Sequence, residues 1–338
     1  MIREAIDALV LGQPMTIDQA STVMTEVMEG ETTPSQLGAF LAALRIKGET
    51  VQEIAGMARV MRDKALHVDV DGITVDTCGT GGDSSGTFNI STAAAFVAAG
   101  AGLKVAKHGN RAASGVCGSA DVLEALGVAI DLGPPEVKRC IDEVGIGFMF
   151  APTFHPAMKH AAPVRREIGI RTVFNILGPL TNPAMTCHQL LGVADPSLGE
   201  KMAQVLDLMG SQHSLVVHGE DGLDELTLGA KTLVWELKEG TISSYRVDPV
   251  ELGLSYVSKN AVRGGDAQHN AYLVKRVLSG DPGPFRDFVL LNSAGVLVAG
   301  DKASTLKEGV ALAREVVNSK AAIAKLEGLI KLSRSLVR

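Results

Sequence analysis

From Asp69 to Glu220 the chain alternates short β-type runs with alanine- and leucine-rich helical stretches, and this order constrains the fold more than any other feature. The pairs are ITVDTC with STAAAFVAAG, LKVAKHG with ADVLEALG, IGFMF with HPAMKHAAPVRREIG, and HQLLGVAD with LGEKMAQVLDLMG, followed by SLVVHGE. Strands that are separated by crossover helices usually run parallel to one another. The sequence therefore predicts an α/β domain with a mainly parallel sheet.

The segment before this alternation carries sequence signals of helix N-termini. Thr16, Thr33 and Thr50 each stand three residues before a Gln or Glu, which is the spacing of a capping box. Pro34 falls at the first position of the second helix, where its fixed φ is favourable. We expect a small all-helical domain over residues 1–67, rejoined by a helical segment near residues 160–185, and an α/β domain over residues 69–338. The stretch NILGPLTNPA, residues 175–184, predicts a loop at the return point between the two domains.

Composition excludes several classes of protein. With 32 Lys and Arg against 38 Asp and Glu, the net charge is −6, so we expect no nucleic acid or acidic membrane as a partner. The four cysteines form no C-x-x-C pair, which disfavours a zinc site or a disulfide framework. The longest apolar runs fall short of the ~20 residues of a membrane span. We expect a cytoplasmic protein.

The loop VDTCGTGGDSSG, residues 75–86, follows a predicted strand and precedes a helix that we expect to begin near Ser91. In that position, backbone N–H groups and a helix N-terminus receive anions. The loop lacks the lysine of a P-loop, and Ser84 replaces the third glycine of a dinucleotide-binding loop. Ser91 or Thr92 is expected to cap the helix. A glycine-rich turn without a ligand is the alternative.

Three further clusters carry candidate chemistry, each with a plainer alternative. The stretch KHGNRAASGVCGS, residues 107–119, leaves another predicted strand with cations and small hydroxyls, or else is a solvated basic loop. The pair Asp224 and Glu225 could hold magnesium, or else lies in a surface turn. The stretch PVRRE, residues 163–167, lies on a predicted helix preceded by His155, and a charged helix face is the default interpretation of its two arginines.

Six blocks in this order and spacing resemble the anthranilate phosphoribosyltransferases of tryptophan biosynthesis: DTCGTGGD, TFNIST, KHGNRAASGVCGSADVLEALG, HPAMKHAAPVRREIG, NILGPLTNP and HGEDGLDE. The likeness runs from about residue 5 to residue 320. It implies transfer of the phosphoribosyl group of phosphoribosyl pyrophosphate (PRPP) to the amine of anthranilate, with Mg²⁺, two ions in each active site. It also implies the nucleoside phosphorylase-like phosphoribosyltransferase fold and a homodimer that forms through the helical domain.

The resemblance also assigns site residues. It implies a PRPP site formed by Gly79, Gly82, Asp83, Thr87, Asn89, Ile90, Ser91, Thr92, Lys107, His108, Gly109, Asn110, Arg111, Ala112, Ala113, Ser114, Gly115 and Ser119. It implies magnesium ligands at Ser91, Asp224 and Glu225, and anthranilate contacts at Gly79, Asn110, His155 and Arg165.

A mechanism follows from these groups. Lys107, Arg111 and magnesium would offset the charge that grows on the departing pyrophosphate, while Asp83 would accept bonds from ligand hydroxyls or metal-bound water. An aromatic amine is uncharged at neutral pH, so we assign no general base. A pyrimidine nucleoside phosphorylase and a non-enzymatic paralogue that binds phosphates or nucleotides are the alternatives.

Overall fold

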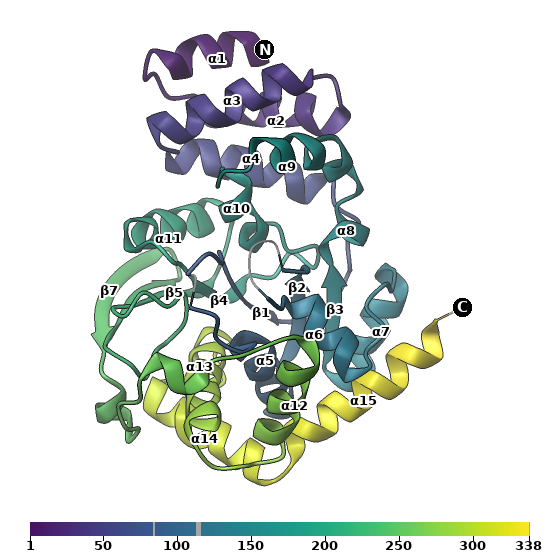
Figure 1. The fold of residues 1–338 in the computed structure, drawn as a ribbon, viewed down its shortest axis with the longest axis vertical. Helices are drawn as coiled ribbons and strands as arrows, with labels where there is room; N and C mark the ends of the chain where they lie inside the picture. Colours follow the sequence, from purple (N-terminus) through teal and green to yellow (C-terminus); the bar gives the residue numbers. More distant parts are fainter. Residues whose placement is uncertain (84, 113–115, 338) are drawn as a thin grey trace.

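A computed structural model describes residues 1–83, 85–112 and 116–337. Its N-terminal layer is a bundle of four helices, drawn in purple and blue in Figure 1: α1 (Ile2–Val10), α2 (Ile17–Glu29), α3 (Pro34–Lys47) and α4 (Val51–Asp63). All three predicted capping boxes are confirmed: the side chains of Thr16, Thr33 and Thr50 each accept the N3 amide, and their backbone amides donate to the N3 side chain. Pro34 begins α3 as predicted.

The third capping box differs from the other two because its acid is buried. Glu53 is 0% exposed, and its Oε2 accepts bonds from the Thr50 amide at 2.8 Å and from Lys47 Nζ at 2.9 Å. Its Oε1 accepts the amide of Met15 at 3.0 Å. One carboxylate therefore ties the start of α4 to the end of α3 and to the turn that precedes α2.

The second layer is a seven-stranded sheet with the order β3-β2-β1-β4-β5-β6-β7. The first five strands are parallel, whereas β6 and β7 are antiparallel additions at one edge, so the prediction of a mainly parallel sheet is confirmed. Because β1 lies between β2 and β4, the strand order reverses there. The strands are β1 (Thr74–Gly79), β2 (Lys104–Gly109), β3 (Ile146–Phe150), β4 (His188–Gly192), β5 (His213–Gly219), β6 (Thr232–Lys238) and β7 (Thr241–Val247).

Helices cover both faces of this sheet (Figure 1). On one side, α5 and α13 pack against the central strands. This group of helices comprises α5 (Ile90–Gly100), α12 (Ala267–Leu278), α13 (Pro284–Ala299), α14 (Leu306–Asn318) and α15 (Ala321–Leu336). On the other side, α11 (Gly199–Leu208) packs between β5 and α4. The remaining crossover helices are α6 (Ser119–Leu126) and α7 (Pro134–Val144). Among the residues that the structure describes, no helix combines the length and the hydrophobicity that a membrane span requires.

The chain returns to the N-terminal bundle after β3. It does so through α8 (Ala151–Phe154), η1 (Pro156–His160), α9 (Ala162–Ile168), α10 (Phe174–Leu177) and η2 (Gly178–Leu180). Here α9 packs against α3, and α10 packs against α4. Short 3-10 helices elsewhere are η3 (Pro196–Leu198), η4 (Pro249–Leu252) and η5 (Lys259–Val262).

The predicted loop over residues 175–184 is wrong for its first half, which is helical up to Leu180. Leu177 and Leu180 are buried, and Arg62 of α4 donates its Nε–H to the carbonyl of Leu180 at 2.7 Å. Packing against the bundle overrides the local preference of the Gly, Pro and Asn residues for a loop.

The bundle and the sheet share an apolar core. One cluster of buried side chains contains Met24 and Phe40 of the bundle together with Leu191 of β4, Met202 of α11 and Val216 of β5. A second cluster lies between the sheet and the helices α5, α12, α13 and α15. The bundle is therefore packed onto the sheet through side chains, in addition to being linked to it by the chain.

Candidate active site

The carboxyl ends of the central parallel strands meet at one edge of the sheet, at the point where the strand order reverses. Open α/β sheets bind their ligands at this position. Gly79 ends β1 and Gly192 ends the neighbouring β4, and both face Asp224 from the segment after β5. A Cβ on Gly79 would overlap the carboxylate of Asp224, and one on Gly192 would overlap its backbone oxygen. The structure therefore brings together two predicted site residues, Gly79 and Asp224, that lie far apart in the sequence.

The loop after β1 is shaped by glycine. Gly81 and Gly82 have φ of +61° and +83°, values that residues with a Cβ seldom adopt. The Gly81 amide donates to Asp224 Oδ2 at 2.9 Å. Asp83 accepts the amide and the hydroxyl of Ser85, so it closes the next turn of the loop. Thr87 lies beside this turn, with its Oγ1 3.2 Å from Ser85 Oγ. Ser84 lies outside the described residues.

Three acidic side chains gather at this loop. Burial and the neighbouring Asp83 raise the pKa of Asp224 to about 7. Burial and Asp224 raise the pKa of Glu225 well above its usual range, although Lys107 and the amide of Ser91 oppose that shift. Carboxylates that repel one another in this way are suited to a divalent cation with oxygen ligands, such as Mg²⁺. The predicted metal ligands Ser91, Asp224 and Glu225 are thus neighbours.

Another cluster satisfies the distances of a metal site more closely but has a different explanation. Ring nitrogens of His188 and His213 and a carboxylate oxygen of Asp301 lie within 4.8 Å of one another. His213 places Nδ1 2.7 Å from Asp301 and Nε2 2.9 Å from Glu236, and Lys238 Nζ is 3.3 Å from Asp301. Burial opposes the positive charge of His213, but these two carboxylates raise its pKa overall. A protonated imidazole satisfies both acids, so this cluster is an ion-pair network at the amino ends of β4 and β5.

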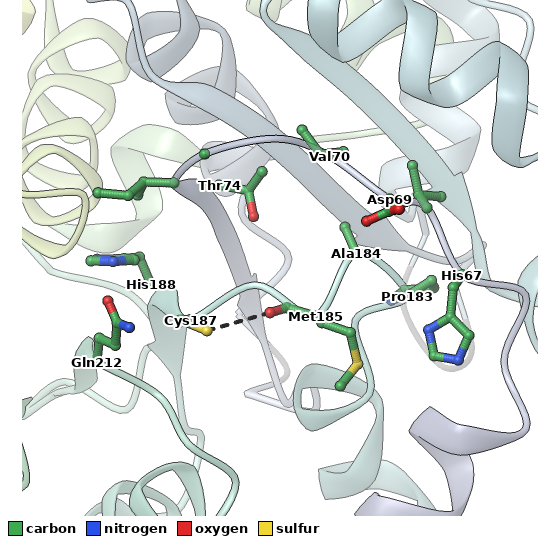
Figure 2. A pocket seen from close by; sticks show the side chains of 13 residues that line it. His67, Asp69, Val70, Thr74, Pro183, Ala184, Met185, Cys187, His188 and Gln212 are labelled. Carbon is green, nitrogen blue, oxygen red and sulfur yellow. Dashed lines mark hydrogen bonds between the residues drawn. The ribbon is translucent and has the colours of Figure 1, made fainter.

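The same amino ends border a cavity of about 550 Å³. Figure 2 shows its wall, formed by the connection that precedes β1, from His67 to Thr74, and by residues that flank β4 and β5, including His188 and Gln212. Cys187 donates to the carbonyl of Met185 at 3.5 Å along this wall (Figure 2). This cavity lies at the opposite end of the strands from the glycine loop, so it is separate from the candidate site.

Lys107 lies beneath the glycine loop. Its side chain is 2% exposed, and Nζ donates to the carbonyl of Thr77 at 2.6 Å. Asp76, which is fully buried, accepts the side-chain amide of Asn182 at 2.7 Å and the backbone amides of Thr77 and His108. The charge of Lys107 opposes the rise in the pKa of Asp76 that burial causes. In this position Lys107 balances buried carboxylates, and its contact with a leaving pyrophosphate stays a prediction.

The loop after β2 is organised by Asp121 of α6. Asp121 Oδ2 accepts the amides of Ala112 and Gly118 at 3.0 and 2.8 Å, and Oδ1 accepts Arg111 Nη1 at 3.0 Å. Arg111 also pairs with Glu124 at 2.8 Å. The predicted residues Ala113, Ser114 and Gly115 lie outside the described residues.

Gly109 and Asn110 begin this loop. A Cβ on Gly109 would overlap Ser119 Oγ, which donates to the carbonyl of Asn110 at 3.3 Å. The Asn110 side chain accepts the amide of Arg111 at 2.8 Å. Gly109, Asn110 and Ser119 therefore lie together at the end of β2.

The N-terminus of α5 faces the glycine loop, but the predicted cap is wrong. The N-cap residue is Asn89, followed by the buried Ile90, so Ser91 and Thr92 are already inside the helix. The Asn89 side chain makes no capping bond. It donates to the carbonyl of Cys117 at 3.2 Å and accepts Asn270 Nδ2 at 2.9 Å. The cap is lost because these tertiary contacts join the loops after β1 and β2.

Two of the predicted anthranilate contacts, His155 and Arg165, lie on the returning segment. Arg165 of α9 is half-buried, with its guanidinium 5.0 Å from the ring centre of Phe174. His155 and His108 are buried, with ring centres 5.0 Å apart. Burial lowers the pKa of His155 to about 4, and burial together with His155 lowers that of His108 to about 3. Both rings are neutral at pH 7.

Comparisons with known proteins agree with this architecture. Residues 3–65 match the helical bundle domain of a glycosyl transferase family, and residues 71–323 match its a/b domain. The chain is 58% identical to the anthranilate phosphoribosyltransferase of Dehalococcoides mccartyi (strain ATCC BAA-2266 / KCTC 15142 / 195) over 338 residues, 99% of each chain. It belongs to the anthranilate phosphoribosyltransferases.

Solved anthranilate phosphoribosyltransferases share the whole fold. That of Thermus thermophilus is 46% identical, with a TM-score of 0.93 over 98% of this chain and 99% of the other. The Saccharomyces cerevisiae enzyme in complex with PRPP and Mg is 30% identical, with a TM-score of 0.85 over 99% and 94%. The same yeast enzyme in complex with 4-fluoroanthranilate is 28% identical, with a TM-score of 0.89 over 99% and 98%.

In this member of the anthranilate phosphoribosyltransferases, sequence reasoning missed three residues that hold the site together. Asp76 and Asn182 lie in the motifs DTCGTGGD and NILGPLTNP, and an acid inside an apolar strand was the available signal for Asp76. Asn270 lies on α12 and has no local signal, because its partner Asn89 is distant in the sequence.

Proposed function

We propose that this chain transfers the phosphoribosyl group of PRPP to the amine of anthranilate, giving N-(5-phosphoribosyl)-anthranilate and pyrophosphate, a step of tryptophan biosynthesis. The observation that carries the proposal is the meeting of the glycine loop, the N-terminus of α5 and the Asp224–Glu225 pair at the switch point of the sheet. This arrangement is suited to a phosphorylated ligand and its metal.

We propose Ser91, Asp224 and Glu225 as ligands for Mg²⁺, two ions in each site. The raised pKa values of the two acids support this assignment, and yeast relatives were solved with Mg. Bound magnesium would neutralise part of the pyrophosphate charge. The chain's own contribution is to hold the two carboxylates beside the glycine loop, where the Gly81 amide orients Asp224.

The donor site that we propose comprises the loops after β1 and β2 and the start of α5. Backbone N–H groups of the glycine loop and of α5 would bind phosphate oxygens, and Asp83 and Ser119 would meet ligand hydroxyls. Asp121 accepts the amides of Ala112 and Gly118, and Asn89 donates to the carbonyl of Cys117, so these described parts of the second loop are oriented before the charge on the pyrophosphate develops.

The acceptor site that we propose lies between these loops and α9. Arg165 would bind the anthranilate carboxylate through two parallel N–H···O bonds, beside Asn110, Gly79 and His155. The two neutral histidines supply an uncharged aromatic wall for the ring. The aromatic amine is itself uncharged, so it can attack C1 of the ribose before it loses its proton, and no general base is assigned.

The test is the loss of anthranilate fluorescence in the presence of PRPP and magnesium. We expect a loss that depends on all three components. A pyrimidine nucleoside phosphorylase would instead cleave thymidine or uridine with phosphate and leave anthranilate fluorescence unchanged. A non-enzymatic paralogue would bind PRPP without turning it over.

We also propose a division into a helical domain, residues 1–67 with the returning segment near 160–185, and an α/β domain over 69–338. The separate family matches and the packing of α9 against α3 support it. A homodimer through the helical domain is supported by exposed apolar side chains, Val10 and Leu11 at the end of α1 and Ile46 on α3. The four free cysteines support a cytoplasmic location.

A further inference from the structure

Arg171 contacts the glycine loop after β1. It lies between α9 and α10, on the segment that returns to the bundle. Its guanidinium occupies the space beside Gly82 that a Cβ would fill, and Nη2 donates to the carbonyl of Thr80 at 3.3 Å. Because Gly82 has no side chain, a planar cation can lie directly against the backbone of the loop.

The other candidate cations for pyrophosphate already have partners. Lys107 is buried on the carbonyl of Thr77, and Arg111 pairs with Asp121 and Glu124. Arg171 is exposed and, within residues 1–83, 85–112 and 116–337, forms no ion pair with a carboxylate. Its charge is therefore open to an anion that enters the loop.

The position of Arg171 also indicates which anion it would bind. The adjacent Gly81 donates to Asp224, a proposed magnesium ligand, so Arg171 lies on the part of the loop that borders the metal carboxylates. Magnesium and pyrophosphate charge would gather there, and guanidinium binds phosphate oxygens through a directed fork.

We propose that Arg171 is a further donor-binding residue whose guanidinium holds the pyrophosphate group of PRPP. The inference rests on the proposed function. As the bond between C1 and the pyrophosphate oxygen breaks, its electron pair passes to that oxygen while the amine nitrogen bonds to C1 and its proton leaves to water. Arg171 would stabilise the negative charge that remains on the pyrophosphate.

The experiment compares Arg171→Ala, Arg171→Lys and the control Arg166→Ala, which removes an exposed arginine from the same segment. Steady-state kinetics should show an apparent KM for PRPP raised about tenfold or more in Arg171→Ala, partly recovered in Arg171→Lys. The KM for anthranilate should stay within about twofold. In calorimetric titration with pyrophosphate in magnesium buffer, the affinity of Arg171→Ala should be lower than that of the parent by a similar factor. The affinity of Arg166→Ala should match the parent.

The two measurements keep the inference separate from the proposed function. A parent protein that binds pyrophosphate but transfers nothing to anthranilate would overturn the function, while the titration would still decide the role of Arg171. Unchanged pyrophosphate affinity in Arg171→Ala would overturn the inference, as would an effect confined to anthranilate.

Discussion

At the scale of the residue, two arginines of the returning segment serve two different anions in our proposals. Arg165 lies against the ring of Phe174, and Arg171 lies against the backbone of Gly82. A guanidinium can bind a carboxylate or a phosphate through a directed fork of hydrogen bonds. The two arginines should therefore be separable by kinetics.

Arg165→Ala should weaken the use of anthranilate by roughly ten- to a hundredfold, because a charge-assisted pair contributes about 1.5–3 kcal/mol. Arg165→Lys should recover part of this loss, and the KM for PRPP should hardly change. Steady-state kinetics with varied anthranilate measures the effect. Aniline, which lacks the carboxylate, should be an equally poor acceptor for the parent and for Arg165→Ala. A mutation that slowed aniline as strongly as anthranilate would contradict the assignment.

A pH-dependent contribution to stability is expected at His213. The groups that face it are Glu236 and Lys238 of β6, Asp301 after α13, and His188 of β4. Because the folded state raises the pKa of His213, its stabilising contribution is complete below the unfolded value of about 6.5. It is lost as the pH rises through the folded value.

The difference in unfolding free energy between the parent and His213→Gln should therefore shrink as the pH rises from about 6 to 9. Urea unfolding at a series of pH values measures it. His269→Gln, which removes an exposed histidine, should give a difference that is independent of pH. A constant difference for His213→Gln would mean that folding does not raise the pKa of His213.

At the scale of the element, two helices with the same capping pattern should differ in how much that pattern contributes to stability. The capping boxes of α3 and α4 share one pattern, but Gln36 is only partly buried whereas Glu53 is fully buried and bonded to Lys47 and Met15. Glu53→Ala leaves the ammonium of Lys47 without its partner, so it should cost about 3 kcal/mol or more. Gln36→Ala should cost about 0.5 kcal/mol or less. Circular dichroism during urea unfolding would rank them, and equal losses would contradict the buried role of Glu53.

Elements were predictable where the signal is local. The three threonine caps, the five parallel strands and the crossover helices follow from spacing and periodicity within a few residues. The cap of α5 and the helix α10 were missed, because bonds from Asn270 and Arg62 decide the local structure there. Such bonds join segments that the sequence does not place together.

At the scale of the whole molecule, the exposed apolar side chains of the bundle predict an interface. Ile46 is 87% exposed on α3, and burying it against a second copy would be favourable. Ile46→Glu should yield a monomer in sedimentation equilibrium, whereas the parent and Val250→Glu should remain dimers. A parent that sediments as a monomer would contradict the homodimer.

The site was predictable to the extent that it lies in contiguous motifs. Resemblance pointed to Asp224 and Gly79 separately, and the fold then brings them into contact. The burial of Lys107 and the position of Arg171 were beyond sequence reasoning, because they depend on how the returning segment and β2 pack. Sequence patterns indicate which types of residue form a site, whereas the burial of each charged side chain is known only from the packed structure.

The apolar cluster that the bundle shares with β4, β5 and α11 has a consequence for how the protein melts. The bundle cannot detach without exposing Leu191 and Val216 of the sheet, and Arg62 would also lose its bonds to Leu180 and Met209. Heat should therefore unfold both layers together. A scanning calorimeter should record one endotherm whose calorimetric and van't Hoff enthalpies agree. Two separated endotherms, or a fragment 1–67 that folds alone, would show that the shared cluster does not couple them.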